Sequence, residues 1–435
     1  MRARSTVVVV VLFAASGCLA SGGNAPVDRM PPPTRGRSDG GTRADAGRPA
    51  PPPTGCAGGT ATTVSGVVRF PNGTLPVSNA FVYVPTGSVD DVARSGECGE
   101  CVDGASVSAH TTTGSDGRFE LTGLTGGARQ IVIEKGKFRR VANVEITECT
   151  RNELDAELIR LPRDSSEGQV PHVAVVQGEY DRMEVVLQQI GLAPSAVDLI
   201  ASPIYGDASS DQASALLRDR ARLTSYDIVL VNCGAWVTDY DGVALFSDAT
   251  VRDNLRAFVQ GGGRLYATDL SYEIVEVTNP EMADFYGGTG DGMSSTVERP
   301  FGDAEIGDPM DSVVATVHDE DLRAWLEVNG ALSGHDTMTV DGMLDGFTMM
   351  DRASPTHAKT WVDGAVEWGS YIGVSGRGVR PLTVSTELGC GRTLFTSYHT
   401  VEESWGGSGG LVGQELALAY LVLEIGSCVQ DPVLY

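Results

Sequence analysis

The chain has 435 residues, of which 20% are charged and 41% hydrophobic, and its formal net charge is −25. So acidic a protein repels phosphate backbones, which excludes nucleic acid as a partner. The length is enough for two or three domains.

The N-terminus predicts export and lipid attachment. A basic start, Met1 to Arg4, precedes an apolar run from Thr6 to Ala15 that is too short to span a bilayer as a mature helix. The run ends in Ala15-Ser16-Gly17-Cys18, which resembles the lipobox of bacterial lipoproteins and implies a diacylated Cys18. An ordinary cleaved signal with an incidental cysteine is the alternative. We expect residues 1–18 to be signal peptide and lipobox, with the membrane as a partner through the lipid.

Residues 19–55 predict a tether. Pro, Gly, Arg, Asp, Ser and Ala dominate this stretch, and PPP occurs at Pro31 and again at Pro51. Such a composition cannot bury a core and stays extended and disordered. With Leu19 after the cysteine, the resemblance to lipoprotein sorting patterns implies the cell envelope, at the outer membrane of a Gram-negative bacterium.

Residues 56–160 predict an all-β sandwich. Alternating patterns with polar turns indicate five short strands, in TVSGVVRFPNG, NAFVYVPTG, GRFELTGL, RQIVIEKG and VANVEITEC. The turn Asn72-Gly73 and the later Asp116-Gly117-Arg118-Phe119 resemble the signature of the carboxypeptidase regulatory-like (prealbumin-like) domain family. That resemblance implies a scaffold or binding sandwich without catalytic residues. The insertion Gly87 to Ser108 is either its recognition loop or a pinned surface loop.

After a linker at 161–171, residues 172–428 predict a flavodoxin-like, doubly wound α/β domain, followed by a tail at 429–435. Strand and helix patterns alternate from HVAVVQG through RMEVVLQQIGL, VDLI, DQASALLRDRARL, YDIVLVNCG, ATVRDNLRAFVQGGG and RLYATDL. An irregular insertion is expected at about 279–364. RPLTVSTELGCGRTLFTSYHT then predicts a strand pair, and GQELALAYLVLEIG a last helix.

Parts of this domain resemble the class I glutamine amidotransferase-like superfamily, especially its trehalose-utilisation-protein-like branch. The matching stretches are YDIV at Tyr226, LRAFV running into GGGR at Gly261, and Gly391-Arg392 running into Phe395-Thr396-Ser397. The resemblance implies a nucleophile elbow, a strained turn that exposes a cysteine beside free backbone N–H groups. Here Asp269 takes that place, with no cysteine and no flanking glycines.

Ligands of such sheets bind beyond the carboxyl ends of the strands. The residues expected there are Gly178, Glu179, Tyr180, Asn232, Cys233, Gly234, Thr268, Asp269, Ser271, His399, Glu402 and Glu403. The resemblance implies that His399 occupies the place of the catalytic histidine, with Glu402 as its orienter. We name Cys233, Asp269, His399 and Glu402 as catalytic candidates; a buried inert thiol and a structural histidine are the alternatives.

Eight cysteines in an exported chain predict disulfides. With Cys18 assigned to lipid, we favour Cys56 with Cys149, Cys98 with Cys101, and Cys390 with Cys428, although crossed pairings stay open. Cys233 is then the odd thiol. CxxC at Cys98 without neighbouring histidines favours structural use over zinc.

Three functions remain open. The first is a non-catalytic envelope lipoprotein with a binding or scaffolding role, without a cofactor, because the elbow lacks its nucleophile. The second is a hydrolase that uses Cys233 with His399, or a metal held by Asp269, Glu273 and His399, with Glu179 as a further ligand. The third is an envelope carbohydrate-binding protein whose tryptophans line a sugar cleft; the partner is otherwise an envelope protein.

Overall fold

The computed structural model describes residues 56, 61–89, 91–92, 98, 106–203, 211–236, 245–285, 304–343, 346–369, 375–400 and 410–426. The predicted signal, lipobox, tether and tail lie outside these residues, as does Glu402. Among the described residues no helix has the length and apolarity needed to cross a membrane. All of them belong to the compact unit that begins at Pro49.

The N-terminal region contains two small sheets. Their strand orders are β4-β1-β7 and β3-β2-β5-β6. Alternate residues of β1 are buried, because one face of each strand packs into the core. The elements are β1 (Thr63–Val67), β2 (Phe81–Val84), β3 (Ala109–Thr112), β4 (Arg118–Leu121), β5 (Gly127–Lys135), β6 (Phe138–Ile146), β7 (Arg151–Glu153) and α1 (Ala156–Ile159).

The five strands predicted for this region are present as β1, β2, β4, β5 and β6. The structure adds β3, which pairs with β2, and the three-residue β7, which pairs in parallel with β1. Both are too short and too polar to show a period in the sequence. The region is therefore β-rich, as expected.

The second region is built on parallel strands with helices between them. Its order runs β9-β8-β10-β11-β20, and all four neighbouring pairs are parallel. The elements are β8 (Val173–Val176), α2 (Met183–Gln189), β9 (Val197–Ile200), α3 (Gln212–Arg218), α4 (Arg220–Leu223), β10 (Ile228–Val231), α6 (Ala249–Gln260), β11 (Arg264–Thr268), α7 (Tyr272–Thr278), β20 (Gly391–Thr396) and α9 (Gly413–Ile425).

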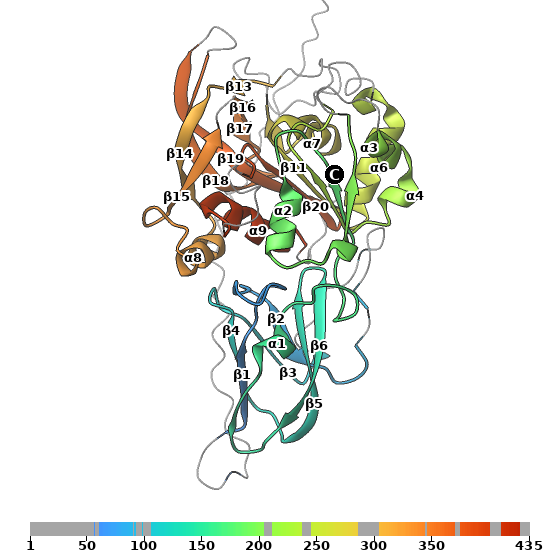
Figure 1. Ribbon diagram of the computed structural model, residues 1–435, viewed down its shortest axis with the longest axis vertical. Coiled ribbons are helices and arrows are strands. Elements are labelled where there is room, and N and C mark those ends of the chain that lie inside the picture. The colour runs from blue at the N-terminus through green and yellow to red at the C-terminus, as the bar shows by residue number, and fades with distance from the viewer. Residues whose placement is uncertain are drawn as a thin grey trace, which may run out of the picture. The chain divides into compact units, whose positions relative to one another are not determined.

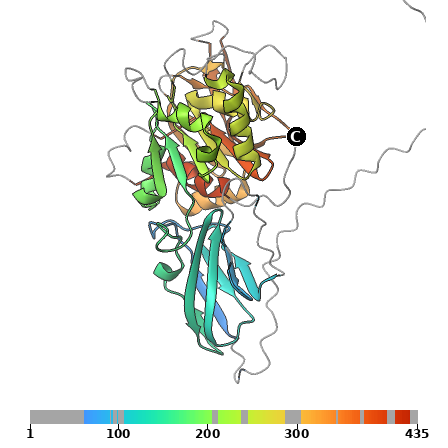
Figure 2. The same cartoon turned by 90° about the vertical axis from the view of Figure 1, so that its right-hand side faces the viewer.

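Both faces of these strands are covered. In β10, Ile228 and Leu230 belong to one core, whereas Val229 and Val231 belong to another. Helices α2 and α9 pack on the first face, and α3, α6 and α7 on the second (Figure 1). Figure 2 shows the yellow-green helices of the second face turned toward the viewer. Double coverage explains why these strands are continuous apolar runs rather than alternating ones.

The insertion at about 279–364 was predicted to be irregular, and this is wrong. Three of its strands extend the parallel sheet through β19, in the order β15-β14-β18-β19-β20, with antiparallel pairing throughout. The elements are β12 (Ala283–Asp284), β13 (Ile306–Gly307), β14 (Met310–Val317), α8 (Glu320–Val328), β15 (Thr337–Met343), β16 (Phe347–Thr348), β17 (Arg352–Ala353), β18 (Lys359–Trp368) and β19 (Gly376–Leu388).

Two disulfides are present among the described residues. Cys56 bonds Cys149, which is the pairing favoured from the sequence. Cys98 bonds Cys390, 292 residues away, so its predicted pairing within the CxxC motif is wrong. Chain folding brings these two sulfurs together, and spacing along the sequence carries no information about such a contact.

The pairing of Cys390 with Cys428 is wrong for the same reason, since Cys390 is already bonded. Cys101 and Cys428 lie outside the described residues. Cys233 is a free, buried thiol.

Candidate metal site

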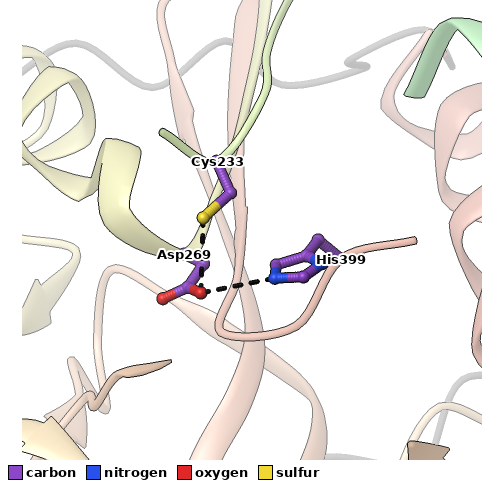
Figure 3. A group of neighbouring side chains, drawn as sticks. All are labelled: Cys233, Asp269 and His399. Atoms are coloured by element: carbon purple, nitrogen blue, oxygen red, sulfur yellow. Dashed lines mark hydrogen bonds and ion pairs between the residues drawn. The ribbon is translucent and has the colours of Figure 1, made fainter. Parts of the chain in front are cut away.

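Three side chains from three strand ends meet at the carboxyl edge of the parallel strands. Cys233 follows β10, Asp269 follows β11 and His399 follows β20. The Cys233 sulfur lies 3.4 Å from Asp269 Oδ2, and His399 Nε2 lies 3.6 Å from the same oxygen. Figure 3 shows the carboxylate between the thiol and the imidazole. These are the only three His, Cys, Asp or Glu side chains in the described ranges whose ligand atoms lie close enough to share one metal ion.

The turn after β10 holds Cys233 against the loop after β8. Gly234 has a φ of +84°, a left-handed conformation that glycine adopts without strain, and it reverses the chain directly after the cysteine. The backbone N–H of Tyr180 donates to the Cys233 carbonyl at 3.1 Å. A Cβ on Gly178 would overlap that same carbonyl, so the two loops touch through their backbones.

Asp269 lies on a strained turn. Its φ is +45°, in the left-handed region that aspartate tolerates better than most residues. The turn Asp269–Ser271 is a short 3-10 helix that leads directly into α7. Asp269 therefore has a left-handed backbone between a strand and a helix, although no glycines flank it. Asp269 Oδ1 accepts a hydrogen bond from the backbone N–H of Thr348, on β16, at 2.7 Å.

A backbone contact fixes the tautomer of His399. Its Nδ1 lies 2.9 Å from the carbonyl oxygen of Thr400. Since a carbonyl can only accept, Nδ1 carries a proton, and a neutral ring then presents the lone pair of Nε2 to Asp269. A lone pair facing a carboxylate is repelled unless a proton or a metal cation lies between them. The side chain is 20% exposed, which makes it the accessible member of the three.

Burial controls the charge of the other two groups. Cys233 and Asp269 are 1% and 3% exposed. Loss of solvent raises the pKa of the Cys233 thiol well above its ordinary value, and the nearby Asp269 raises it further. Burial also raises the pKa of Asp269, against the opposing effect of His399. A free thiol here is protonated near neutral pH and donates its S–H to the carboxylate.

The described residues Ser271, Glu273 and Glu179, which were also predicted for this edge, are not part of the cluster. Ser271 Oγ donates to the Asn232 carbonyl at 2.8 Å. Neither Glu273 nor Glu179 belongs to the cluster, so the predicted ligand set of Asp269, Glu273 and His399 is replaced by one that contains Cys233. Glu402 lies outside the described residues.

Most of the described tryptophans are core residues. Trp236, Trp325 and Trp361 are at most 3% exposed, so they cannot stack on a sugar. Trp368 is half-buried, with the Arg380 guanidinium 4.4 Å from its ring centre. Trp405 lies outside the described residues.

Sequence reasoning missed three residues that support the site. Thr348 lies in the insertion, where no family resemblance holds, and it contributes through its backbone. Asp181 and Thr400 are buried polar residues next to the predicted strand ends. Their position directly beside Tyr180 and His399 is the only signal in the sequence that they belong to this edge.

Comparison with known proteins gives no family. No protein-family model and no curated protein matches the chain. Among solved structures, Cytoplasmic Protein STM3548 from Salmonella typhimurium is 12% identical, covering 60% of this chain and 99% of its own, with a TM-score of 0.34.

A second structure, Cytoplasmic Protein STM1381 from Salmonella typhimurium LT2, is 9% identical, covering 59% of this chain and 98% of its own, with a TM-score of 0.30. Similarities this weak carry no argument about the function of this chain.

Proposed function

We propose that the chain is an exported, lipid-anchored hydrolase that holds one divalent metal ion, with zinc as the best match, between Cys233, Asp269 and His399. The observation that carries the proposal is the convergence of these three side chains at the carboxyl edge of the parallel strands. Thiolate, imidazole and carboxylate are the three protein ligands that zinc uses. Three protein ligands leave a fourth position open, as in catalytic rather than structural zinc sites.

The distances support tetrahedral coordination. Zinc lies about 2.3 Å from sulfur and about 2.0–2.2 Å from nitrogen or oxygen, so tetrahedral ligand atoms lie roughly 3.3–3.7 Å apart. The sulfur–oxygen and nitrogen–oxygen distances here are 3.4 and 3.6 Å. The Cys233 sulfur and His399 Nε2 lie within 4.8 Å of one another, so bringing these two atoms to the same spacing is the rearrangement that binding the ion would require.

The surroundings of the three ligands also suit a metal ion. The N–H of His399 Nδ1 is held by a carbonyl, which leaves Nε2 to coordinate. Asp269 keeps Oδ1 on the Thr348 amide, which leaves Oδ2 to coordinate. Burial raises the pKa of Cys233, and the backbone N–H of Leu270, which lies near the sulfur, offsets part of that rise.

The same N–H argues against covalent acyl transfer. At a nucleophile elbow, the amide after the nucleophile stabilises the oxyanion. Here that amide belongs to Leu270, and its N–H lies near the Cys233 sulfur, where it offsets part of the rise in the pKa of the thiol. The thiol itself is a poor nucleophile because burial raises its pKa. A bound cation would favour the thiolate and would supply Lewis-acid activation of a water molecule.

The proposal extends to the two domains and to the lipid anchor. The strand order β9-β8-β10-β11-β20 supports a flavodoxin-like, amidotransferase-like domain whose nucleophile position has become a metal ligand. The two sheets at 56–160 are proposed to be a carboxypeptidase regulatory-like sandwich that presents this domain. Attachment through Cys18 would place both domains at the cell envelope.

Metal analysis of the purified full-length chain tests the proposal. The wild type is expected to bind one zinc ion per chain, and Cys233→Ser, Asp269→Asn and His399→Asn to lose it. His318→Asn is the matched control, because His318 forms a histidine–carboxylate pair with Asp363 at 2.7 Å outside the cluster. Zinc-dependent cleavage in a panel of esters, amides and phosphoesters should follow the same pattern.

The contrary result would be a wild-type chain that takes up no divalent metal and cleaves nothing in that panel. It would favour a non-catalytic envelope protein with a binding or scaffolding role. Such a role would be consistent with the near-complete burial of Cys233 and Asp269, because a substrate could not reach these side chains directly.

A further inference from the structure

One buried carboxylate connects the loops that carry the three ligands. Asp181 is fully buried in the loop between β8 and α2. Its Oδ2 accepts from Thr268 Oγ1 at 2.6 Å. Its Oδ1 accepts from Thr400 Oγ1 at 2.7 Å, Thr400 N at 3.1 Å and Arg182 N at 2.7 Å. Both oxygens therefore accept hydrogen bonds, and each serves a different strand end.

The two oxygens reach the ligands by different routes. Thr268, which donates to Oδ2, accepts the backbone N–H of Cys233 at 2.8 Å and directly precedes Asp269. Thr400, which donates to Oδ1, directly follows His399 and holds its Nδ1 through the Thr400 carbonyl. The path from Asp181 to each ligand contains at most one residue.

A third connection runs through the backbone of the same residue. The Asp181 carbonyl accepts from the Asn232 side chain at 3.2 Å, and Asn232 directly precedes Cys233. Such groups, which orient ligands without touching the metal, typically change metal affinity by about 10- to 100-fold when they are replaced.

We infer that Asp181 is the positioning residue of the metal site: it fixes the spacing of Cys233, Asp269 and His399 by tying together the loops after β8, β10, β11 and β20. The inference rests on the proposed metal site. It assigns Asp181 no contact with the metal or with substrate.

Asp181→Asn separates the two branches. The amide oxygen of asparagine can still accept from Arg182 and Thr400, so the His399 branch is kept. Its NH₂ group can only donate, so the Thr268 hydroxyl must turn its proton toward the Val231 carbonyl oxygen, 3.5 Å away, and the branch to Cys233 is weakened. The variant should therefore loosen the sulfur ligand more than the imidazole.

The matched control is Asp227→Asn. Asp227 is also fully buried, and it accepts from the His172 backbone at 2.9 Å, beside the opposite, amino end of β10. Both variants replace a fully buried carboxyl group beside the same sheet with an amide. A purely structural effect on the fold would therefore lower the stability of both without distinguishing their metal sites.

The experiment measures zinc affinity by chelator competition, and the Co²⁺ absorption spectrum, on the full-length chain. Asp181→Asn should bind one Zn²⁺ about 10- to 100-fold more weakly than wild type, with a reduced thiolate-to-cobalt charge-transfer band. Asp227→Asn should match wild type in both measurements. Thr268→Val should reproduce the weaker zinc binding and the altered cobalt spectrum of Asp181→Asn. Thr268→Ser, which keeps the hydroxyl, should match wild type in both measurements.

Equal zinc affinity and an unchanged cobalt spectrum in Asp181→Asn and Thr268→Val would overturn the inference while leaving the metal site intact. A wild-type chain that binds neither Zn²⁺ nor Co²⁺ would overturn both. If Asp181→Asn does not fold, the Thr268 pair decides alone.

Discussion

Gly178→Ala should weaken zinc binding and lower folding stability through the same loop, and the two effects can be measured separately. A Cβ at this position would overlap the Cys233 carbonyl and would lie 2.7 Å from the Asn232 carbonyl oxygen. Carbon–oxygen contacts are ordinarily about 3.3 Å or longer, so the loop after β10 must move by at least roughly 0.6 Å. Metal–ligand distances tolerate only about 0.2 Å. The displaced sulfur should therefore bind zinc poorly.

The expected loss is at least about tenfold in zinc affinity, or about 1.4 kcal/mol. Overpacking of the buried loop should also lower the free energy of unfolding by about 1–3 kcal/mol. Chelator competition measures the first quantity and urea denaturation of the metal-free chain the second. Gly87→Ala is the control, because a Cβ at Gly87 would have no neighbour within 4 Å.

Unchanged zinc affinity in Gly178→Ala, together with the predicted loss of stability, would refute the reasoning. It would mean that the position of Cys233 does not limit metal binding. Unchanged stability would instead show that the loop after β10 moves without cost.

Three further predictions concern the rest of the chain. A hydrogen bond from the Arg160 side chain holds the pKa of Glu167 at about 2, against an ordinary 4.5. Ionised Glu167 therefore stabilises the folded chain fully above about pH 5, and this contribution is lost as the pH falls toward 2. Denaturation at a series of pH values should show that the free energy of unfolding of Glu167→Gln is about 1–2 kcal/mol below wild type at pH 7. The variant should also lack the loss of stability at acid pH, and parallel pH profiles for the two proteins would contradict this. Non-reducing peptide mapping should recover Cys56 with Cys149 and Cys98 with Cys390, and any other partner for these cysteines would count against the fold. Fatty-acid labelling in a Gram-negative host should disappear in Cys18→Ser, and labelling that persists would exclude lipidation at Cys18.

The sequence predicted the parallel strands well because their burial on both faces leaves a direct trace. Continuous apolar runs such as Ile228–Val231, with helical patterns on either side, are typical of strands buried in a parallel sheet. The strands of the insertion were missed. In β15 only Met338 and Val340 follow the period of two expected for a half-buried strand, and Met343 breaks it, so the pattern in the sequence is short.

The members of the cluster were predicted to lie at one edge of the sheet, and a metal-dependent hydrolase was one of the alternatives, but its expected ligands included Glu273 rather than Cys233. Cys233, Asp269 and His399 were placed at one edge because parallel strands end together there. Their convergence on one carboxylate oxygen depends on the backbone of Asp269. Its φ of +45° could not be predicted from the residue pattern. The roles of Asp181 and Thr348 depend on contacts across 219 and 79 residues, which spacing cannot reveal.

X-ray absorption at the zinc edge, on the purified full-length chain loaded with one equivalent of zinc, tests the central claim most directly. We predict one sulfur at about 2.3 Å and the remaining ligands nitrogen or oxygen at about 2.0–2.2 Å, with the sulfur contribution lost in Cys233→Ser. A zinc shell without sulfur, or one that Cys233→Ser leaves unchanged, would contradict the account.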